Sequence, residues 1–541
     1  MNKKNLLLVL IVLFSILGGL LLGNLLARRA LLNENILSLK NTFLNRNAGN
    51  KVSDLLSIID EQYVDSVDVN EMTEELMIDL VSKLDPHSTY IPAADLADVN
   101  SELEGSFSGI GIQFNIQNDT IMVVAVISGG PSEKVGMLAG DRIVEVNDTA
   151  FVGKEVNNEK VMRKLRGQSG TKVRIGVRRS GTAEILRYDI TRGAIPIHSV
   201  AASYIIKPGV GFIRVDKFAQ NTYSEFLHAI ADLRSKGATK YIVDLRENSG
   251  GLMDQAINMV NEFMPKGSLI VYSEGKAYPR YEALADGRGS CVNTPLVVLI
   301  DDFSASASEI FAGAIQDNDR GLVVGRRSFG KGLVQQQLPL RDGSAIRLTV
   351  ARYYTPSGRS IQKPYERGKS EDYERDLLNR YLNGEFFNAD SIHLKKDSTL
   401  IYKTVKGRTV YGGGGIMPDV FVPRDTTKYT NYLTKVVNGG FLYQFAFQYT
   451  DQHRERLNKF KSWQELEKYL DHQALLSEFT VFAVSKGIAS KPSEIAISKS
   501  IIENSLTAYI IRNVLGDEGF YPVFYKDDNV VLRAVEEIGK M

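Results

Sequence analysis

The spacing of hydrophobic residues changes along the chain, and each change marks a different kind of structure. Between about residues 33 and 88, apolar residues recur at three- and four-residue steps, which predicts helices that end at Asp85-Pro86. From about residue 102 to 191, short apolar runs alternate with glycine turns. This second pattern is typical of a small domain built from β-strands.

Strands and helices alternate in the central part, from about residue 209 to 423. The apolar run Tyr241–Leu245 is followed by a glycine turn and a helical stretch, and residues 295–300 form a second such run before another helix. This alternation predicts a βαβ sheet that is covered on both faces. An insert at 363–406 is charged and rich in tyrosine without clear periodicity, and residues 429–538 are again helical in pattern.

An uncharged run from Leu6 to Ala27 lies near the N-terminus, with two lysines before it and two arginines after it. A helix of this length spans about 33 Å, enough to cross the hydrocarbon core of a bilayer. A cleaved signal peptide is the alternative, although Leu25-Leu26-Ala27 is a poor match to a small-x-small cleavage site. We expect an anchor in the inner membrane, with the rest of the chain in the periplasm or cell envelope.

Composition removes several classes of function. The 541 residues carry 65 Lys and Arg against 64 Asp and Glu, and a net charge of +1 gives no electrostatic case for binding nucleic acid. The single cysteine, Cys291, excludes an intrachain disulfide and a cysteine-built metal site. The six histidines are scattered and form no metal-binding pair, so we expect no metal.

Two glycine-rich loops are candidates for binding an anion through the backbone. Residues 107–112 precede a strand, and their N–H groups would converge on an anion such as a peptide carboxylate. Residues 244–251 follow a buried strand, and an N–H of Gly250 or Gly251 would point at a developing oxyanion. Taken alone, an ordinary tight turn is the simpler interpretation of each loop.

Three alternating serines, of which Ser306 is the central one, stand where a strand ends and a helix begins. Ser306-x-x-Glu309 is a capping-box pattern, so helix capping alone explains it. A serine nucleophile also suits the positive end of a helix, but it needs a base within hydrogen-bond reach. No histidine lies between 229 and 392, which leaves Lys331 as a candidate base, provided that burial lowers its pKa.

Taken together, these motifs resemble known families. Residues 96–191 resemble a PDZ domain, and residues 50–425 as a whole resemble the carboxy-terminal processing (tail-specific) serine proteases with an embedded PDZ domain. The motifs that carry the second resemblance, in matching order, are Arg246–Gly251, Ser304–Glu309, Gln316-Asp317, Val323–Gly325, Phe329–Gly332 with Gln335, and Tyr354–Ile361.

The resemblance implies an α/β multidomain protein, with a crotonase-like βαβ protease core, an inserted PDZ domain and helical N- and C-terminal segments. The implied divisions are 1–27 for the anchor or signal segment, 28–95 for an N-terminal helical segment, 96–191 for the PDZ domain, 192–425 for the protease core with its charged insert 363–406, and 426–541 for a C-terminal helical region. Shorter relatives lack the insert, which leaves its role and the range of substrates open.

The resemblance also implies roles for single residues. Ser306 matches the nucleophile, Lys331 the base, and Gln335 the residue that orients the lysine. The implied oxyanion hole consists of the N–H groups of Ala307, Gly250 and Gly251, and the implied peptide-binding residues are Gly109, Ile110, Gly111 and Ile112. The family needs no metal and no organic cofactor.

These expectations predict a serine endopeptidase that uses a Ser–Lys dyad to cleave exported proteins near C-terminal tails held by the PDZ domain. The expected partners are proteins or peptides with a free C-terminal tail, the membrane, and a second copy of the chain through its helical ends. Two alternatives stay open: a catalytically silent PDZ scaffold that only binds tails, and a membrane-bound Ser–His–Asp hydrolase. The lack of a suitably placed histidine counts against the hydrolase.

Overall fold

The computed structural model describes residues 46–117, 119–127, 129–179, 181–392 and 398–541. The chain divides into two compact units, Met1–Leu80 and Val81–Met541, which are described separately. The first contains α2 (Arg46–Gln62) and most of α3 (Val69–Ser82). The predicted membrane segment, residues 6–27, lies outside the described residues. Among the residues that are described, no helix is long and apolar enough to cross a membrane.

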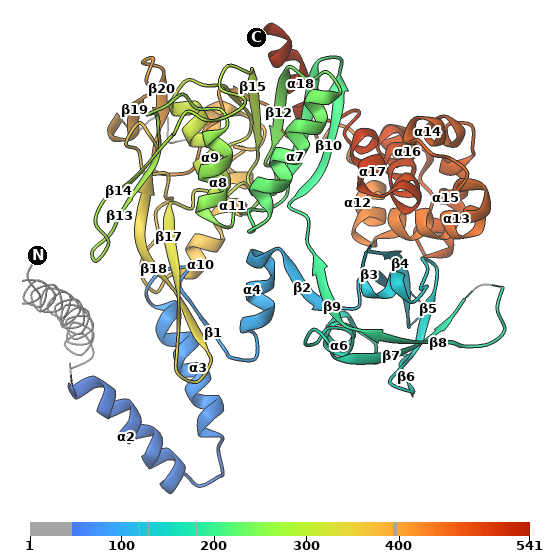
Figure 1. The fold of residues 1–541 in the computed structure, drawn as a ribbon, viewed down its shortest axis with the longest axis horizontal. Coiled ribbons are helices and arrows are strands. Elements are labelled where there is room, and N and C mark those ends of the chain that lie inside the picture. Colours follow the sequence, from blue (N-terminus) through green and yellow to red (C-terminus); the bar gives the residue numbers. More distant parts are fainter. Residues whose placement is uncertain (1–45, 118, 128, 180, 393–397) are drawn as a thin grey trace, which may run out of the picture. The chain divides into compact units, whose positions relative to one another are not determined.

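The second unit contains a six-stranded sheet, of which β10, β12 and β15 are labelled in Figure 1. Its strand order is β10-β11-β12-β15-β16-β21, and every neighbouring pair is parallel except β10 and β11. This is the βαβ arrangement that the apolar runs predict. The strands are β10 (Val200–Lys207), β11 (Val210–Val215), β12 (Lys240–Asp244), β15 (Leu296–Ile300), β16 (Leu322–Gly325) and β21 (Val420–Phe421).

Helices cover both faces of this sheet, because successive residues of a strand point to opposite sides. Val243 of β12 packs in a cluster with α7 (Thr222–Ser235), α8 (Met253–Asn261) and α9 (Ala307–Asp317). The isoleucine before it faces the opposite side, where it packs with α18 (Asn529–Lys540). Helix α18 therefore completes the core on this face of the sheet.

The second unit contains another sheet of five strands. Its strands follow the order β1-β18-β13-β14, and β17 pairs antiparallel with β18. The loop 326–332, which contains Lys331, joins β16 of the first sheet to β17 of the second. The strands are β1 (Thr89–Ile91), β13 (Leu269–Glu274), β14 (Tyr281–Leu284), β17 (Leu333–Pro339) and β18 (Ala345–Tyr354).

The segment predicted as a PDZ domain is a six-stranded antiparallel sheet with two helices, α5 (Pro131–Lys134) and α6 (Asn158–Leu165). Helix α4 (Leu96–Glu104) precedes it, and β2 pairs with β9 where the chain enters and leaves the domain. The pair consists of β2 (Ser106–Gly109) and β9 (Gly193–Pro196), and the six-stranded sheet of β3 (Ile112–Gln117), β4 (Thr120–Val126), β5 (Arg142–Val146), β6 (Thr149–Ala150), β7 (Lys172–Arg178) and β8 (Leu186–Thr191).

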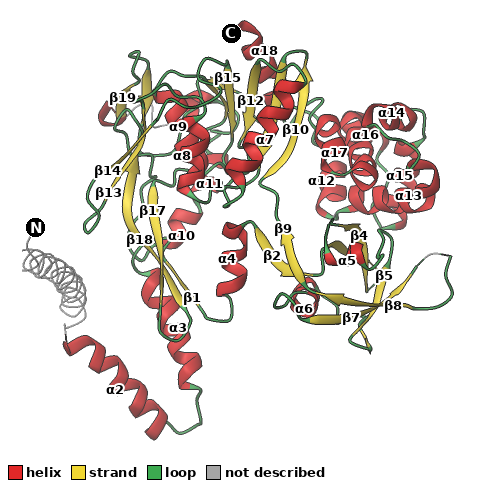
Figure 2. Cartoon of the chain, in the orientation of Figure 1, coloured by secondary structure: helices red, strands yellow, loops and turns green. Residues whose placement is uncertain are grey.

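The charged insert contains two short helices, α10 (Ser370–Glu374) and α11 (Asp376–Leu382), followed by the hairpin of β19 (Ile401–Lys403) and β20 (Thr409–Tyr411). The C-terminal region is helical (Figure 2), and its buried side chains form a hydrophobic core of their own. Its helices before α18 are α12 (Asn431–Asn438), α13 (Phe441–Leu457), α14 (Trp463–Leu470), α15 (Leu475–Ser485), α16 (Pro492–Leu515) and α17 (Asp517–Phe524).

Candidate active site

Ser306 occupies the sharp turn between β15 and α9, where it is the N-cap residue of the helix. Its φ of 56° and ψ of −112° lie in a region that residues other than glycine rarely adopt, at a cost of about 1–3 kcal/mol. A strained strand-to-helix turn of this kind also presents the nucleophilic serine of α/β-hydrolases. The serine is therefore held at the N-terminus of α9, where the helix dipole favours negative charge.

The loop after β12 lies against Ser306. A Cβ placed on Gly250 would be 2.7 Å from the Cβ of Ser306 and 3.0 Å from the backbone nitrogen of Ala307, so this approach requires glycine. The Gly250 N–H donates to Asn248 Oδ1 at 2.8 Å. Within the described residues, the N–H groups of Gly251 and Ala307 have no hydrogen-bond partner, which leaves both available to an oxyanion.

Lys331 reaches the same site from the loop between the sheets. Its Nζ donates to Gln335 Oε1 at 2.9 Å, and Gln335 Nε2 donates to the carbonyl oxygen of His87 at 2.6 Å. Burial lowers the pKa of Lys331, and the nearby cation Arg347 lowers it further. In the described structure the Lys331 amine bonds to Gln335, and no hydrogen bond joins it to the Ser306 hydroxyl.

One buried carboxylate connects the two predicted catalytic residues. Glu309 Oε2 accepts the N–H of Ser306 and the N–H of Lys331, both at 2.8 Å. Its Oε1 accepts the N–H of Gly330 at 2.7 Å and the hydroxyl of Ser328 at 2.5 Å. Burial raises the pKa of Glu309 to about 7, although all four hydrogen bonds oppose that rise.

Tyr353 makes a second connection. Its hydroxyl lies 2.6 Å from the carbonyl oxygen of Lys331 and 3.0 Å from that of Ser306. The carbonyl oxygen of Ser306 also accepts the N–H groups of Glu309 and Ile310. The Tyr353 hydroxyl has one proton, and its shorter hydrogen bond is to the carbonyl oxygen of Lys331. The main chains of Ser306 and Lys331 are thus tied together through Glu309 on one side and Tyr353 on the other.

Residues 85–88 bring His87 to the site. Asp85 Oδ1 accepts the N–H groups of His87 and Ser88, both at 2.9 Å, and the hydroxyl of Thr349 on β18 at 3.1 Å. Burial alone would raise the pKa of Asp85, but the hydrogen bond from the Ser88 hydroxyl to Oδ2 at 2.6 Å, together with those to Oδ1, lowers it overall. Burial and the charge of Lys331 lower the pKa of His87 to about 4, so its ring is neutral at pH 7.

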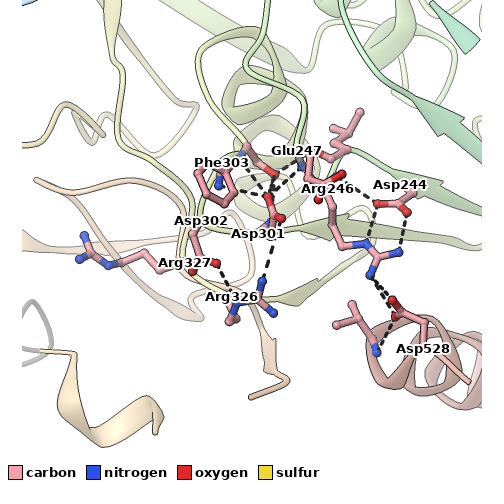
Figure 3. A network of polar contacts seen from close by, with 12 residues as sticks. Asp244, Arg246, Glu247, Asp301, Asp302, Phe303, Arg326, Arg327 and Asp528 are labelled. Carbon is pink, nitrogen blue, oxygen red and sulfur yellow. Dashed lines mark hydrogen bonds and ion pairs between the residues drawn. The ribbon is translucent and has the colours of Figure 1, made fainter. Parts of the chain in front are cut away.

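A polar network fixes the loops that lead to Gly250 and Ser306 (Figure 3). Asp301 Oδ1 accepts the N–H groups of Glu247 at 2.9 Å and of Phe303 at 3.1 Å, and so joins the two loops. Arg246 donates to both carboxylate oxygens of Asp528, at 2.9 and 2.8 Å, which ties the loop after β12 to the start of α18. A cavity of about 530 Å³ opens beside these loops and is lined on its other side by α12, α13 and α16.

The predicted carboxylate loop of the PDZ domain is largely buried, and its carbonyl groups are hydrogen-bonded within the domain. The carbonyl oxygens of Ile110 and Gly111 accept the N–H groups of Ser132 and Ile127, at 2.9 and 3.0 Å. In a trans peptide the N–H points away from the C=O of the same unit, so the N–H groups of Gly111 and Ile112 face away from α5 and β4. Gly111 has a φ of 78°, which favours glycine there.

The structure brings Ser306, Ala307, Gly250, Gly251, Lys331 and Gln335 into one region, and it places Gly109–Ile112 in the separate PDZ domain. Sequence reasoning missed Glu309, Tyr353 and His87 as parts of the site. Glu309 was assigned only to helix capping, and Asp85-Pro86 only to the end of a helix. The sequence signals that could have indicated them are the capping-box spacing for Glu309 and the run Asp85–Tyr90 for His87.

Three stretches of the chain match known families. Residues 209–374 match peptidase family S41, residues 108–189 match the PDZ domain, and residues 432–516 match a family of unknown function, DUF8443. The fold and these matches define a peptidase that carries a PDZ domain.

Named relatives identify the group of peptidases. A carboxy-terminal-processing protease of Bartonella bacilliformis is 37% identical over 317 residues, which cover 58% of this chain and 72% of the relative. The carboxy-terminal processing protease CtpA of Bacillus subtilis is 33% identical over 388 residues, or 70% of this chain and 82% of the relative. The chain belongs to the carboxy-terminal processing proteases of family S41, which are serine peptidases.

Among solved structures, the photosystem II D1 C-terminal processing protease is 26% identical with a TM-score of 0.36, and the match covers 71% of this chain and 89% of that one. The family matches and the structure confirm the predicted fold class, a mixed α/β protein with a protease domain, a PDZ domain and a helical C-terminal segment.

Proposed function

We propose that this chain is a tail-specific endopeptidase with Ser306 as nucleophile and Lys331 as general base, and that its PDZ domain captures the C-terminal carboxylate of the substrate. One observation carries the proposal: Glu309 and Tyr353 each contact the main chains of both Ser306 and Lys331. A serine that only capped a helix would need no such connection to a lysine in the loop between the sheets.

The electrostatics support a neutral lysine. A lysine acts as a base only after it loses its proton, and its ordinary pKa is about 10.4. Burial and Arg347 both lower the pKa of Lys331, so a larger fraction is neutral near pH 8. In the neutral amine, one N–H donates to Gln335 Oε1 and the lone pair remains free for the Ser306 proton.

The reaction then follows four steps. The Ser306 oxygen bonds to the carbonyl carbon of the substrate while its proton passes to Lys331 Nζ. The tetrahedral intermediate collapses, the peptide C–N bond breaks, and the leaving amine takes that proton. Water attacks the resulting ester and gives a proton to Lys331. The acid product leaves as Ser306 regains its hydrogen. The N–H groups of Ala307 and Gly251 would stabilise the oxyanion, with Gly250 as the residue that allows their close approach.

Capture of the substrate tail is supported by the loop Gly109–Ile112. The outward N–H groups of Gly111 and Ile112 suit a carboxylate, and a peptide would add as a strand beside β3. We also propose that the catalytic part acts outside the cytoplasm and that residues 6–27 anchor it, because that run is uncharged and flanked by positive residues. A second copy of the chain as partner stays a prediction.

The test uses the full-length chain in detergent and an unfolded reporter with an apolar C-terminal tail. We expect cleavage by the wild type, and none by Ser306→Ala or Lys331→Ala when circular dichroism reports equal folding. Lys369→Ala changes an exposed lysine and serves as the control. A reporter with an amidated C-terminus should be cleaved more slowly, because its tail lacks the carboxylate.

The outcomes separate the alternatives. Tail binding by the wild type without cleavage would support the silent scaffold. Full activity in Lys331→Ala would exclude the Ser–Lys dyad. Mass spectrometry after treatment with a serine-reactive phosphonate provides an independent check, since the label should lie on the peptide that contains Ser306.

A further inference from the structure

The first part of the charged insert, residues 363–385, packs on the loop that carries Lys331, and we call it the clamp segment. Arg380 of α11 donates to the carbonyl oxygens of Arg327 at 2.7 Å and Ser328 at 3.1 Å. The side chain of Arg380 is only 3% exposed. A buried guanidinium thus holds two successive carbonyl groups just before the lysine.

Glu385 pairs with both arginines at this contact. Its carboxylate accepts two hydrogen bonds from Arg327, at 2.6 and 2.8 Å, and one from Arg380 Nε at 2.8 Å. All three side chains are 3% exposed. Buried charges are stable only when they are paired and hydrogen-bonded, so removal of the Glu385 charge would loosen both arginines.

The clamp segment holds the other side of the loop through Lys363 and Tyr373. The Lys363 N–H donates to the carbonyl oxygen of Gly330 at 2.9 Å. Its ammonium lies 3.9 Å from the centre of the Phe329 ring and 4.0 Å from that of Tyr373, a favourable cation–π arrangement. Phe329 and Gly330 are the two residues directly before Lys331.

Tyr373 also contacts His87, the residue that binds the side chain of Gln335. Its hydroxyl lies 2.8 Å from His87 Nε2, and the carbonyl oxygen of His87 accepts the Gln335 amide that in turn positions the Lys331 amine. The clamp segment therefore contacts both the backbone of the lysine loop and the chain of hydrogen bonds that ends at Lys331 Nζ.

We propose that the clamp segment positions the general base, and that Tyr373, Arg380 and Glu385 are positioning residues for the reaction. Lys331 lies between Gly330, with a φ of 93°, and Gly332, and such a backbone does not fix its own conformation. Directional hydrogen bonds to carbonyl groups supply the missing restraint. This proposal rests on the proposed role of Lys331.

The test compares Glu385→Gln with Glu366→Gln in the full-length enzyme. The second substitution makes the same chemical change in the same insert, on an exposed side chain that pairs with Lys369. We expect kcat to fall by about ten- to hundred-fold in Glu385→Gln with KM nearly unchanged, since displacement of a catalytic group by about 1 Å costs about 100-fold. Glu366→Gln should match the wild type.

A pH profile distinguishes positioning from simple stabilisation. The groups that face Lys331 are Arg347 on β18, Glu309 on α9, and Asp85 and His87 before β1. None of these is changed in Glu385→Gln, so their influence stays. If the loop loosens, water reaches the lysine, and the ascending limb of kcat/KM moves to higher pH. A merely structural role would lower the melting temperature and leave that limb in place.

Two further variants, Tyr373→Phe and Lys331→Ala, test the proposal independently of the folding of Glu385→Gln. If Glu385→Gln does not fold, Tyr373→Phe removes one hydroxyl and keeps the ring, and we expect a loss of kcat of about three- to ten-fold with the same shift of the limb. Unchanged kcat and pH profile in the folded variant would overturn the proposal. Lys331→Ala is assayed in parallel: full activity there would refute the dyad itself, whereas its loss together with a normal Glu385→Gln would refute only the clamp.

Discussion

The carboxylate of Glu309 offers the sharpest test of how the site is held together. Its two oxygens accept four hydrogen bonds, from Ser306 and Lys331 on one oxygen and from Ser328 and Gly330 on the other. Glu309→Gln keeps the shape of the side chain but replaces one acceptor oxygen by an amide that donates. The variant therefore removes the hydrogen bonds of one oxygen and keeps those of the other.

The amide has two orientations. If its nitrogen faces Ser306 and Lys331, both N–H groups lose their partner. If it faces the other pair, the Ser328 hydroxyl rotates and accepts from the amide, while the Gly330 N–H and the Ser328 hydroxyl proton lose their acceptor. The second orientation should prevail, because it keeps the contacts with Ser306 and Lys331, and we expect a loss of about 1–3 kcal/mol for each buried unpaired donor. Catalysis should fall less than ten-fold, because the contacts with Ser306 and Lys331 survive.

Glu309→Ala provides the contrast. It leaves four donors without an acceptor, at about 1–3 kcal/mol each, which is comparable with the whole stability of a domain, about 5–15 kcal/mol. We expect this variant to lose the ordered structure of the loop 326–332 and all activity. The two substitutions at one position thus predict very different outcomes.

Hydrogen exchange measured by mass spectrometry is the appropriate assay, because it reports local opening in a multidomain chain. At pH 8, above the Glu309 pKa of about 7, Glu309→Gln should exchange faster in the peptide that contains Gly330 and unchanged in the PDZ domain. Glu366→Gln serves as the control. Wild-type exchange would refute the hydrogen-bond argument, and a loss of activity above 100-fold with normal exchange would show that the charge acts in the chemistry.

Three other substitutions test separate parts of the site. Gly250→Ala places a methyl group 2.7 Å from the Cβ of Ser306 at a φ of 104°, so kcat/KM in the reporter assay should fall at least ten-fold. Arg347→Gln removes a cation that lowers the pKa of Lys331; the ascending limb of the pH–rate profile should move to higher pH, and an unchanged limb would contradict the assignment of the base. Asp528→Asn weakens the attachment of α18, at a cost of about 1–3 kcal/mol, and limited proteolysis should then release the C-terminal helix more readily than in the wild type.

Sequence patterns predicted the local elements of the core well. The run Tyr241–Leu245 is strand β12, and the serine-rich motif opens helix α9, because strand and helix starts depend on neighbouring residues. Local sequence patterns do not predict which distant elements pack against each other. The helix α18 covers the same sheet almost 300 residues later, and no local pattern specifies which surface an amphipathic helix will cover.

The buried polar residues were underestimated for a related reason. The capping-box spacing explained Glu309 completely at the level of one helix, and its bonds to Gly330 and Lys331 arise only when the loop folds over it. The insert lacks periodicity because its two helices are short and are held by contacts such as the cation–π contact of Tyr373 in α10 and the ion pair of Arg380 in α11, rather than by an apolar stripe. Such contacts leave no period in the sequence.

Ser306 follows a strand of the first sheet and Lys331 lies in the loop that leads to the second, so neither sheet alone determines the distance between them. Glu309 and Tyr353 join their main chains, and Gln335 orients the amine. All of these partners act through hydrogen bonds, which depend on direction more steeply than apolar packing does. Because the apolar core beneath the sheet does not depend on it, removal of the Tyr353 hydroxyl, which bonds the main chain of Lys331, should displace the base while the domain stays folded. Catalysis should therefore be more sensitive than stability to Tyr353→Phe.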